Sequence, residues 1–513
     1  MQAIAWKKLS VPMVFHLLWG SVLWFSISKL GLGLSTDSVH LLFAGMNLAS
    51  GRGLISFDGS PVLVWPPLYP LLLAALHLLT GLSTFAAAHV LQIVAFFGIS
   101  LCLSIFSLHL FPDDFPFVLA GSILSDIGIV VVASFGMVGS DYVHLFLVVL
   151  CVLLTALYVE QPSGRLYLAV FVAAMLAMLQ RYLGLAAIAT AATAMLVWAK
   201  GSPSQHLLRA AFLALAAVPS TLWLLLTSPH IARRAPVSLG ENFTWFSQSI
   251  LEWLFPAASI QAHPVFSLAL LWIAIALLAL VLWLGRRTLR SFAASMLLFG
   301  LLYTLALFGS ASIAYYNRLE GRFLLPLYIP LIMASLLALH ILLGALHARS
   351  PSRYPVGRLA AFGMLAVLAI LLLGAAVPAV QASHSGIDGP GENSFNTLAW
   401  HANRPLFFWQ AHHPEGDYLL LSNQPDGVAF YTQHFCDASP RRRSGPYGTV
   451  EYPIESYAST LFASGQDVYL IWVEPNSQDF YYQPADLGSI ANLEKLYSSL
   501  DGAIYRLTPA PGT

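Results

Sequence analysis

Long, almost uncharged apolar segments recur along most of this chain and constrain its fold more than any other feature. An α-helix needs roughly 20 apolar residues to cross a bilayer, and only 9% of the residues here are charged, against about 25% in a soluble domain. The sequence therefore predicts a polytopic α-helical membrane protein with about 11 transmembrane helices. The expected spans are roughly 11–33, 85–111, 117–136, 142–159, 166–180, 183–199, 210–228, 265–284, 291–313, 323–346 and 359–380.

The chain changes character after the last of these segments. From about residue 381 charges and polar amides return, together with the short β-rich runs Asp417–Ser422, Val468–Val473 and Ala503–Leu507. A stretch of about 130 residues is an ordinary domain size. We therefore expect a membrane domain over residues 1–380 and a small soluble α/β domain over residues 381–513.

The distribution of Lys and Arg predicts the orientation, because these residues collect in cytoplasmic loops. With the N-terminus inside, the cytoplasmic side holds eleven of them and the outer side, before the C-terminal domain, holds seven. This bias requires that residues 66–81, a short segment with several prolines, enter the membrane without crossing it. The C-terminal domain then lies on the extracytoplasmic side, and residues 34–83 and 229–264 form long outer loops.

Both outer loops carry apolar residues at helical spacing. In the first they are Val39, Leu42, Phe43, Met46 and Leu48, and in the second Phe243, Phe246, Ile250 and Trp253. Such a pattern is typical of helices that lie in the membrane interface.

Several classes of function are excluded by what the sequence lacks. The formal net charge is zero, so no basic surface is available for nucleic acid. Three cysteines, two of them inside apolar runs, cannot build a disulfide framework or a cysteine metal site. No Walker loop, HExxH motif or glycine-rich dinucleotide fingerprint is present.

A few acidic residues stand at or within the expected membrane boundary. Asp37 follows the first span and precedes an amphipathic helix, where a carboxylate either caps the helix or acts as a general base. Asp141, with His144 nearby, begins a later span and is open to the same two interpretations. Asp126 lies inside an apolar segment, where ionisable groups are costly and usually functional, or it only pairs with a neighbouring helix.

Basic residues mark two other points on the outer side. Arg181 interrupts two short apolar runs, and Arg318, Glu320 and Arg322 lie just before a span. The planar fork of Arg suits phosphate. Alternatively, Arg181 only extends toward the headgroups, and Glu320 forms a salt bridge with one of its neighbouring arginines.

Three strings together resemble a known family. Residues 37–70 (DSVHLLFAGMNLASGRGLISFDGSPVLVWPPLYP), 181–184 (RYLG) and 318–330 (RLEGRFLLPLYIP) are similar to the polytopic GT-C glycosyltransferases. The likeness is to the bacterial protein-mannosyltransferase-like and aminoarabinose-transferase-like group, which includes the RgtA/B/C/D-like membrane proteins. It covers about residues 11–380.

This resemblance implies a reaction and a place for it. A sugar would pass from a polyprenyl-phosphate donor to a lipid, glycan or protein acceptor on the outer face of a bacterial inner membrane. Asp37 matches the family's catalytic acid. The remaining candidates are Arg181, Arg318 and Arg322 for the donor phosphate, Asp141 as a second acid or metal ligand, and His40, Tyr69, His144 and Glu320 around the acceptor.

Whether a divalent cation such as Mg²⁺ or Mn²⁺ takes part stays open at this point. Many relatives have a second acid directly after the first, and this chain has Ser38 there. A shared metal site would therefore need an oxygen ligand from elsewhere, such as Asp141.

Two other functions fit a polytopic chain. A transporter or flippase of lipid-linked saccharides would commonly have inverted repeats and broken midplane helices, and neither is evident in the sequence. A lipid-linked polymer ligase or polymerase would also have long outer loops. The position of Asp37, directly after the first span, favours the transferase.

Overall fold

The computed structural model describes residues 6–228, 237–255, 260, 264–285, 291–313, 319, 321–350, 352, 354–386, 395–444, 450–474 and 480–510. The chain divides into two compact units. The first comprises residues 1–32, 63–69 and 86–385, and the second comprises residues 33–62, 70–85 and 386–513. We call them the membrane unit and the loop–sheet unit.

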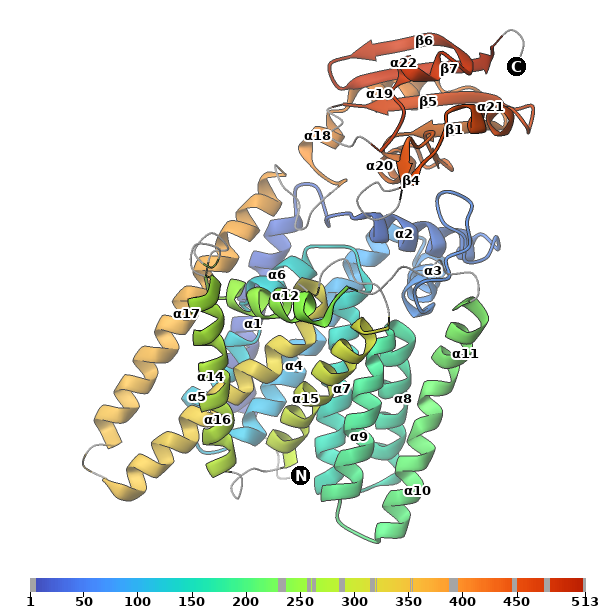
Figure 1. The fold of residues 1–513 in the computed structure, drawn as a ribbon. Coiled ribbons are helices and arrows are strands. Elements are labelled where there is room, and N and C mark those ends of the chain that lie inside the picture. Colours follow the sequence, from blue (N-terminus) through green and yellow to red (C-terminus); the bar gives the residue numbers. More distant parts are fainter. Residues whose placement is uncertain are drawn as a thin grey trace. The chain divides into compact units, whose positions relative to one another are not determined.

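The membrane unit consists of helices (Figure 1). Within the described residues, eight helices are long and apolar enough to cross a bilayer, and the bent pair α5 and α6 makes a ninth. Two shorter apolar stretches, Gly164–Gln180 and Tyr182–Trp198, complete the eleven predicted segments. The polytopic fold is therefore confirmed, and the chain is a multi-pass integral membrane protein.

The bounds of these helices follow the apolar segments closely. They are α1 (Trp6–Ile27), α4 (Thr84–Leu110), α5 (Phe115–Leu124), α6 (Ile129–Phe135), α7 (Ser140–Glu160), α8 (Gly164–Gln180), η1 (Tyr182–Gly184), α9 (Leu185–Trp198), α10 (Pro203–Leu213), η2 (Ala214–Ala217), α11 (Val218–Thr227), α12 (Leu239–Glu252), α14 (Pro264–Leu284), α15 (Ser291–Ala311), η5 (Gly321–Phe323), α16 (Leu325–Arg349) and α17 (Tyr354–Ser385).

Burial differs greatly among these helices. Helix α7 is buried along most of its length, whereas the still more apolar α14 buries none of its residues. A long apolar helix without a protein cover is stable only where lipid surrounds it, because its backbone bonds are satisfied internally and its side chains avoid water. The exposed apolar surface of α14 therefore fits a bilayer.

The short segment with several prolines forms α3 (Leu68–Thr80), a helix of 13 residues. At 1.5 Å per residue it is about 20 Å long, which is less than the roughly 30 Å of a hydrocarbon core. This length favours a segment that enters the membrane without crossing it, and the path of residues 66–81 stays a prediction.

The loop–sheet unit contains a five-stranded mixed sheet in the order β2-β1-β5-β7-β6. Strand β1 is parallel to β2 and β5, while β7 is antiparallel to β5 and β6. The three predicted β-rich runs are confirmed as β1, β5 and β7, and β6 was not predicted. The strands are β1 (Tyr418–Ser422), β2 (Asp437–Ala438), β5 (Asp467–Val473), β6 (Ala491–Ser499), β7 (Gly502–Pro509) and the separate pair β3 (Arg443–Ser444) and β4 (Val450–Glu451).

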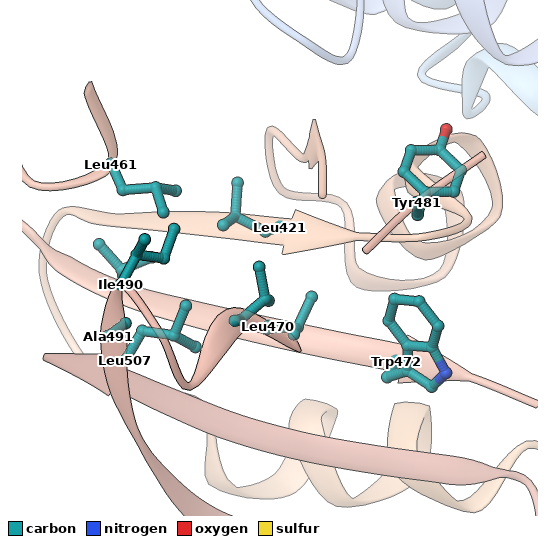
Figure 2. Packing of buried hydrophobic residues seen from close by; sticks show 10 residues of the cluster. Leu421, Leu461, Leu470, Trp472, Tyr481, Ile490, Ala491 and Leu507 are labelled. Carbon is teal, nitrogen blue, oxygen red and sulfur yellow. The ribbon is translucent and has the colours of Figure 1, made fainter. Parts of the chain in front are cut away.

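An apolar cluster on this sheet forms the core of the unit (Figure 2). Leu421, Leu470 and Trp472 project from β1 and β5, and Ile490 and Leu507 pack with them. The accompanying helices are α18 (Leu398–His401), α19 (Arg404–His412), α20 (Pro425–Thr432), α21 (Glu455–Leu461) and α22 (Pro484–Leu487).

Most of the loop after the first span belongs to this same unit. Its helix α2 (Thr36–Ala49) buries Val39, Leu42 and Phe43, and backbone bonds tie the loop to the C-terminal segment. The Phe395 amide donates to Leu34 O at 2.8 Å, and the Cys436 amide donates to Phe57 O at 2.9 Å. The apolar face that the sequence assigns to the membrane interface is therefore covered largely by protein.

Candidate active site

The start of α2 is closed by a reciprocal pair of serines. The Ser35 hydroxyl accepts a bond from the Ser38 amide at 3.3 Å, and the Ser38 hydroxyl accepts one from the Ser35 amide at 3.0 Å. This is a capping box. The alternative interpretation of Asp37 as the helix cap is wrong, because Ser35 holds that place, and Ser38 has a structural role of its own.

Asp37 occupies the first turn of α2, in a neighbourhood of other carboxylates in the loop–sheet unit. The hydroxyl of Thr36 donates to the carboxylate of Asp426, at the start of α20. The pKa of Asp426 is raised to about 6, mainly by burial, and the nearby Asp58 and Asp37 contribute to this rise. Neither Asp58 nor Asp426 was predicted as a site residue. No local sequence motif indicates that the C-terminal domain contacts the first loop.

His40 lies one turn after Asp37 and is held in place. Its Nδ1 is bonded to the Ser56 hydroxyl, and its ring centroid lies 4.7 Å from that of Phe57. Burial lowers the pKa of His40, although Asp58 and Asp37 oppose this shift. The imidazole is therefore predominantly neutral at pH 7, which suits a side chain that orients a substrate hydroxyl.

A second group of predicted residues meets in the membrane unit, where α7 and α16 begin and α8 ends. Arg181 forms an ion pair with Asp141. The guanidinium carbons of Arg181 and Arg322 lie 5.5 and 5.3 Å from the ring centroid of Phe323. The Phe323 carbonyl accepts a 2.9 Å bond from the Tyr303 hydroxyl, so the ring between the two cations has a fixed position.

The RYLG string explains why Arg181 stands there. Helix α8 ends at Gln180, whose side-chain amide donates to Ser140 O at 3.1 Å, and Arg181 follows in an extended conformation. Gly184 then lies so close to α8 that a Cβ atom on it would approach the Ala177 backbone to 2.5 Å. Only glycine allows this tight turn between α8 and α9.

Two further candidates from the sequence are buried beside this group. Tyr69 is fully buried next to the Gly139 backbone, directly before α7. His144 is also buried, and its Nδ1 donates to Ala177 O at 3.1 Å. His144 therefore ties α7 to α8, whereas Tyr69 supports the start of α7.

Arg318 and Glu320 lie outside the described residues. Among the residues that the structure does describe, no three or more His, Cys, Asp or Glu side chains are grouped so as to hold a metal ion. Asp141, the expected extra ligand, is paired with Arg181. The described side chains thus do not fit a metal site built from protein alone.

No protein-family model matches the sequence, and a search of curated proteins found no match. Solved structures do match. ArnT from Cupriavidus metallidurans, in the apo state and bound to undecaprenyl phosphate, aligns with a TM-score of 0.59 and 14% identity over 96% of this chain and 97% of its own.

Two further matches come from other sources. The archaeal oligosaccharyltransferase AglB from Archaeoglobus fulgidus, in complex with an inhibitory peptide and a dolichol-phosphate, aligns with a TM-score of 0.51 and 12% identity over 99% of this chain and 75% of its own. The mycobacterial arabinofuranosyltransferase AftD aligns with a TM-score of 0.50 and 13% identity over 97% of this chain and 41% of its own. With its spans and its C-terminal sheet, the chain thus has the GT-C fold that these membrane glycosyltransferases share.

Proposed function

We propose that the protein transfers a sugar from a polyprenyl-phosphate donor to a lipid, glycan or protein acceptor on the extracytoplasmic side of the membrane. The observation that carries this proposal is the cationic group of Arg181 and Arg322 around Phe323. Two guanidinium groups, one of them paired with Asp141, thus lie at these helix ends. Such a site suits a phosphate that is anchored in the bilayer.

The fold likeness supports the same donor class. ArnT has been solved with undecaprenyl phosphate and AglB with a dolichol-phosphate, and both ligands are lipid phosphates. The sugar and the acceptor are not specified by this likeness. The proposal is therefore limited to a sugar carried on a lipid phosphate.

In the proposed reaction an acceptor hydroxyl attacks the anomeric carbon of the sugar. A bond from the acceptor oxygen to this carbon forms, and the bond from the carbon to the phosphate oxygen breaks. Asp37 takes the proton of the hydroxyl as general base, and the charge that develops on the leaving polyprenyl phosphate is stabilised by Arg181 and Arg322. Attack opposite the leaving group inverts the anomeric configuration.

Asp37 suits the base because the cap of its helix is made by other residues. Ser35 and Ser38 satisfy the first amides of α2, so the carboxylate is not required for them. Replacing it should therefore alter chemistry much more than folding.

A transporter is the competing proposal, and the bent pair α5 and α6 favours it. In transporters, however, the carbonyls at such a break coordinate ions. Here Leu124 O accepts a 2.6 Å bond from the Tyr328 hydroxyl, and Asp126 O accepts a 3.0 Å bond from the Trp19 indole. With these carbonyls engaged, the transferase is the better supported function.

The test is a transfer assay with the purified protein in lipid nanodiscs and a panel of polyprenyl-phosphate sugars. We expect product with at least one donor, and a fall in turnover of about 10²- to 10⁴-fold in Asp37→Asn, as for the loss of a general base. Asp113→Asn, at an exposed position before α5, serves as the control. Near-normal turnover in a folded Asp37→Asn protein would remove Asp37 from the mechanism, and absence of transfer from every donor would contradict the function.

A further inference from the structure

A fully buried histidine–aspartate pair lies at the break between α5 and α6. The two helices meet at an angle of 51°, and Asp126 lies in the four residues between them. Its carboxylate Oδ2 is 2.6 Å from Nδ1 of His16 on α1, and neither side chain is exposed at all. The proposed reaction does not use this pair, so its presence needs another explanation.

Side chains from several helices complete the closure of this break. Ser100 donates to Asp126 Oδ2 at 2.9 Å, and His16 Nε2 is 3.0 Å from the Ser104 hydroxyl. The backbone carbonyls at the break receive the Trp19 and Tyr328 bonds described above. Helices α1 and α16 thus supply hydrogen bonds to the carbonyls of the interrupted α5–α6 backbone, and α4 binds the Asp126 carboxylate.

The other end of α6 is held in the same manner. The buried Gln92 of α4 donates from Nε2 to Met137 O and, at 3.4 Å, to Ser134 O. Gln92, Ser100 and Ser104 are spaced by eight and four residues along α4 and so share one face. Helix α6, only seven residues long, is therefore fixed at both ends by one polar face of α4 and by His16.

The chain between α6 and the cationic group is short. From the last residue of α6, Phe135, four residues lead to Ser140 and then Asp141, which pairs with Arg181. A shift of α6 would consequently move Asp141. We propose that His16 and Asp126 are positioning residues: they fix α6 so that Asp141 and Arg181 meet the donor phosphate in the productive geometry. This inference rests on the proposed function.

A polar contact between two buried side chains is a specific way to hold a helix. Removing one partner leaves a buried polar group of the other without that contact, which is costly away from water. In this case the carboxylate would keep only Ser100, because its Oδ1 has no hydrogen-bond partner among the described residues. The loss of His16 should therefore release the break rather than leave it in place.

The experiment compares Asp126→Asn and His16→Gln with His109→Gln as the matched control. His109 lies at the far end of α4, bonded to Ile105 O of its own helix and stacked on Phe292. We expect faster hydrogen exchange across residues 129–141 in the two variants and not in the control. We also expect the donor KM to rise by about 10- to 100-fold, the effect of a displacement near 1 Å, with the acceptor KM unchanged.

A double variant and a double-mutant cycle test the inference further. The double variant His16→Gln/Asp126→Asn replaces the pair with two amides that can bond to each other, and it should recover much of the donor affinity. The effect of Asp126→Asn should also be non-additive with that of Asp141→Asn in a double-mutant cycle, as expected for coupled residues.

Hydrogen exchange is measured without substrate. It therefore tests whether His16 and Asp126 hold α6 in place, even if no donor is ever turned over. Unchanged exchange at residues 129–141 in the single variants would overturn the inference. A folded single variant with normal donor KM, or a fully additive cycle, would do the same. Absence of transfer by the wild-type protein from every donor would instead contradict only the proposed function.

Discussion

Asp426 begins α20 with a carboxyl group whose pKa burial raises to about 6, against about 3.9 for an ordinary Asp. The folded protein therefore holds this proton more tightly than the unfolded chain does. Its contribution to stability is fully present below about pH 4 and is lost as the pH rises through 6. Asp426→Asn removes the buried charge, so we expect a higher Tm than wild type at pH 7.5 and little difference at pH 4.

Thermal unfolding of both proteins at the two pH values measures this effect. Asp417→Asn, at an exposed position in the same unit, controls for a general change in charge. An equal change in Tm at both pH values would show that Asp426 does not titrate in this range.

Arg322 is an exposed residue beside the Phe323 ring, and we assign it to the donor phosphate. A hydrogen bond to a charged group contributes about 1.5–3 kcal/mol, so Arg322→Ala should weaken donor binding by about tenfold or more. Acceptor affinity should change less. Arg358→Ala, which removes an Arg paired with Asp114 at 3.1 Å, is the control. Unchanged donor affinity, measured by titration with a polyprenyl-phosphate sugar, would make Arg322 a structural residue.

Contacts between residues far apart in the chain could not be predicted from the sequence. The position of Asp37 at a helix start follows from its neighbours in the chain and was predicted. Its relation to Asp426 was not, because packing of α2 against α20 brings the two regions together and no local pattern encodes it. The pairing of Asp141 with Arg181 was missed for the same reason, since each residue was interpreted by itself.

Secondary structure elements were predicted well where a single strong pattern decides them. The apolar segments gave the spans, but residues 117–136 form two helices and not one. The turn-forming residues Ser125, Asp126 and Gly128 are a local signal for this break. Strand β6 was missed because its Leu-Glu-Lys-Leu run favours a helix, and pairing with β7 at the sheet edge overrides that preference.

The α8–α9 turn gives a prediction about an element. Gly184→Ala would push a Cβ atom into the Ala177 backbone, and overpacking of this kind costs about 1–3 kcal/mol. We expect a lower Tm and a weaker donor affinity, because the turn carries Arg181. Gly164→Ala, at the first residue of α8, meets no atom within 4 Å and should leave both unchanged. If the two variants behaved alike in unfolding and binding measurements, the close approach would have no effect.

The whole chain makes a prediction about sidedness. Lys and Arg favour a cytoplasmic N-terminus, an odd number of spans and residues 381–513 outside. Reporter fusions after Arg290, which lies outside the described residues, and after Gln381 should report opposite sides of the membrane. Activity of both fusions on one side would show that one of the apolar segments does not span.

The loop–sheet unit combines segments from distant parts of the chain, so the order of synthesis decides when it can fold. Residues 33–62 leave the ribosome early, while residues 386–513, which complete the same unit, are made last. Helix α2, which packs against α20, therefore lacks this partner until the whole polytopic chain has been made. Asp37, in the first turn of that helix, acquires its mature surroundings only then. An incomplete chain would accordingly be unable to begin the proposed glycosyl transfer during biogenesis.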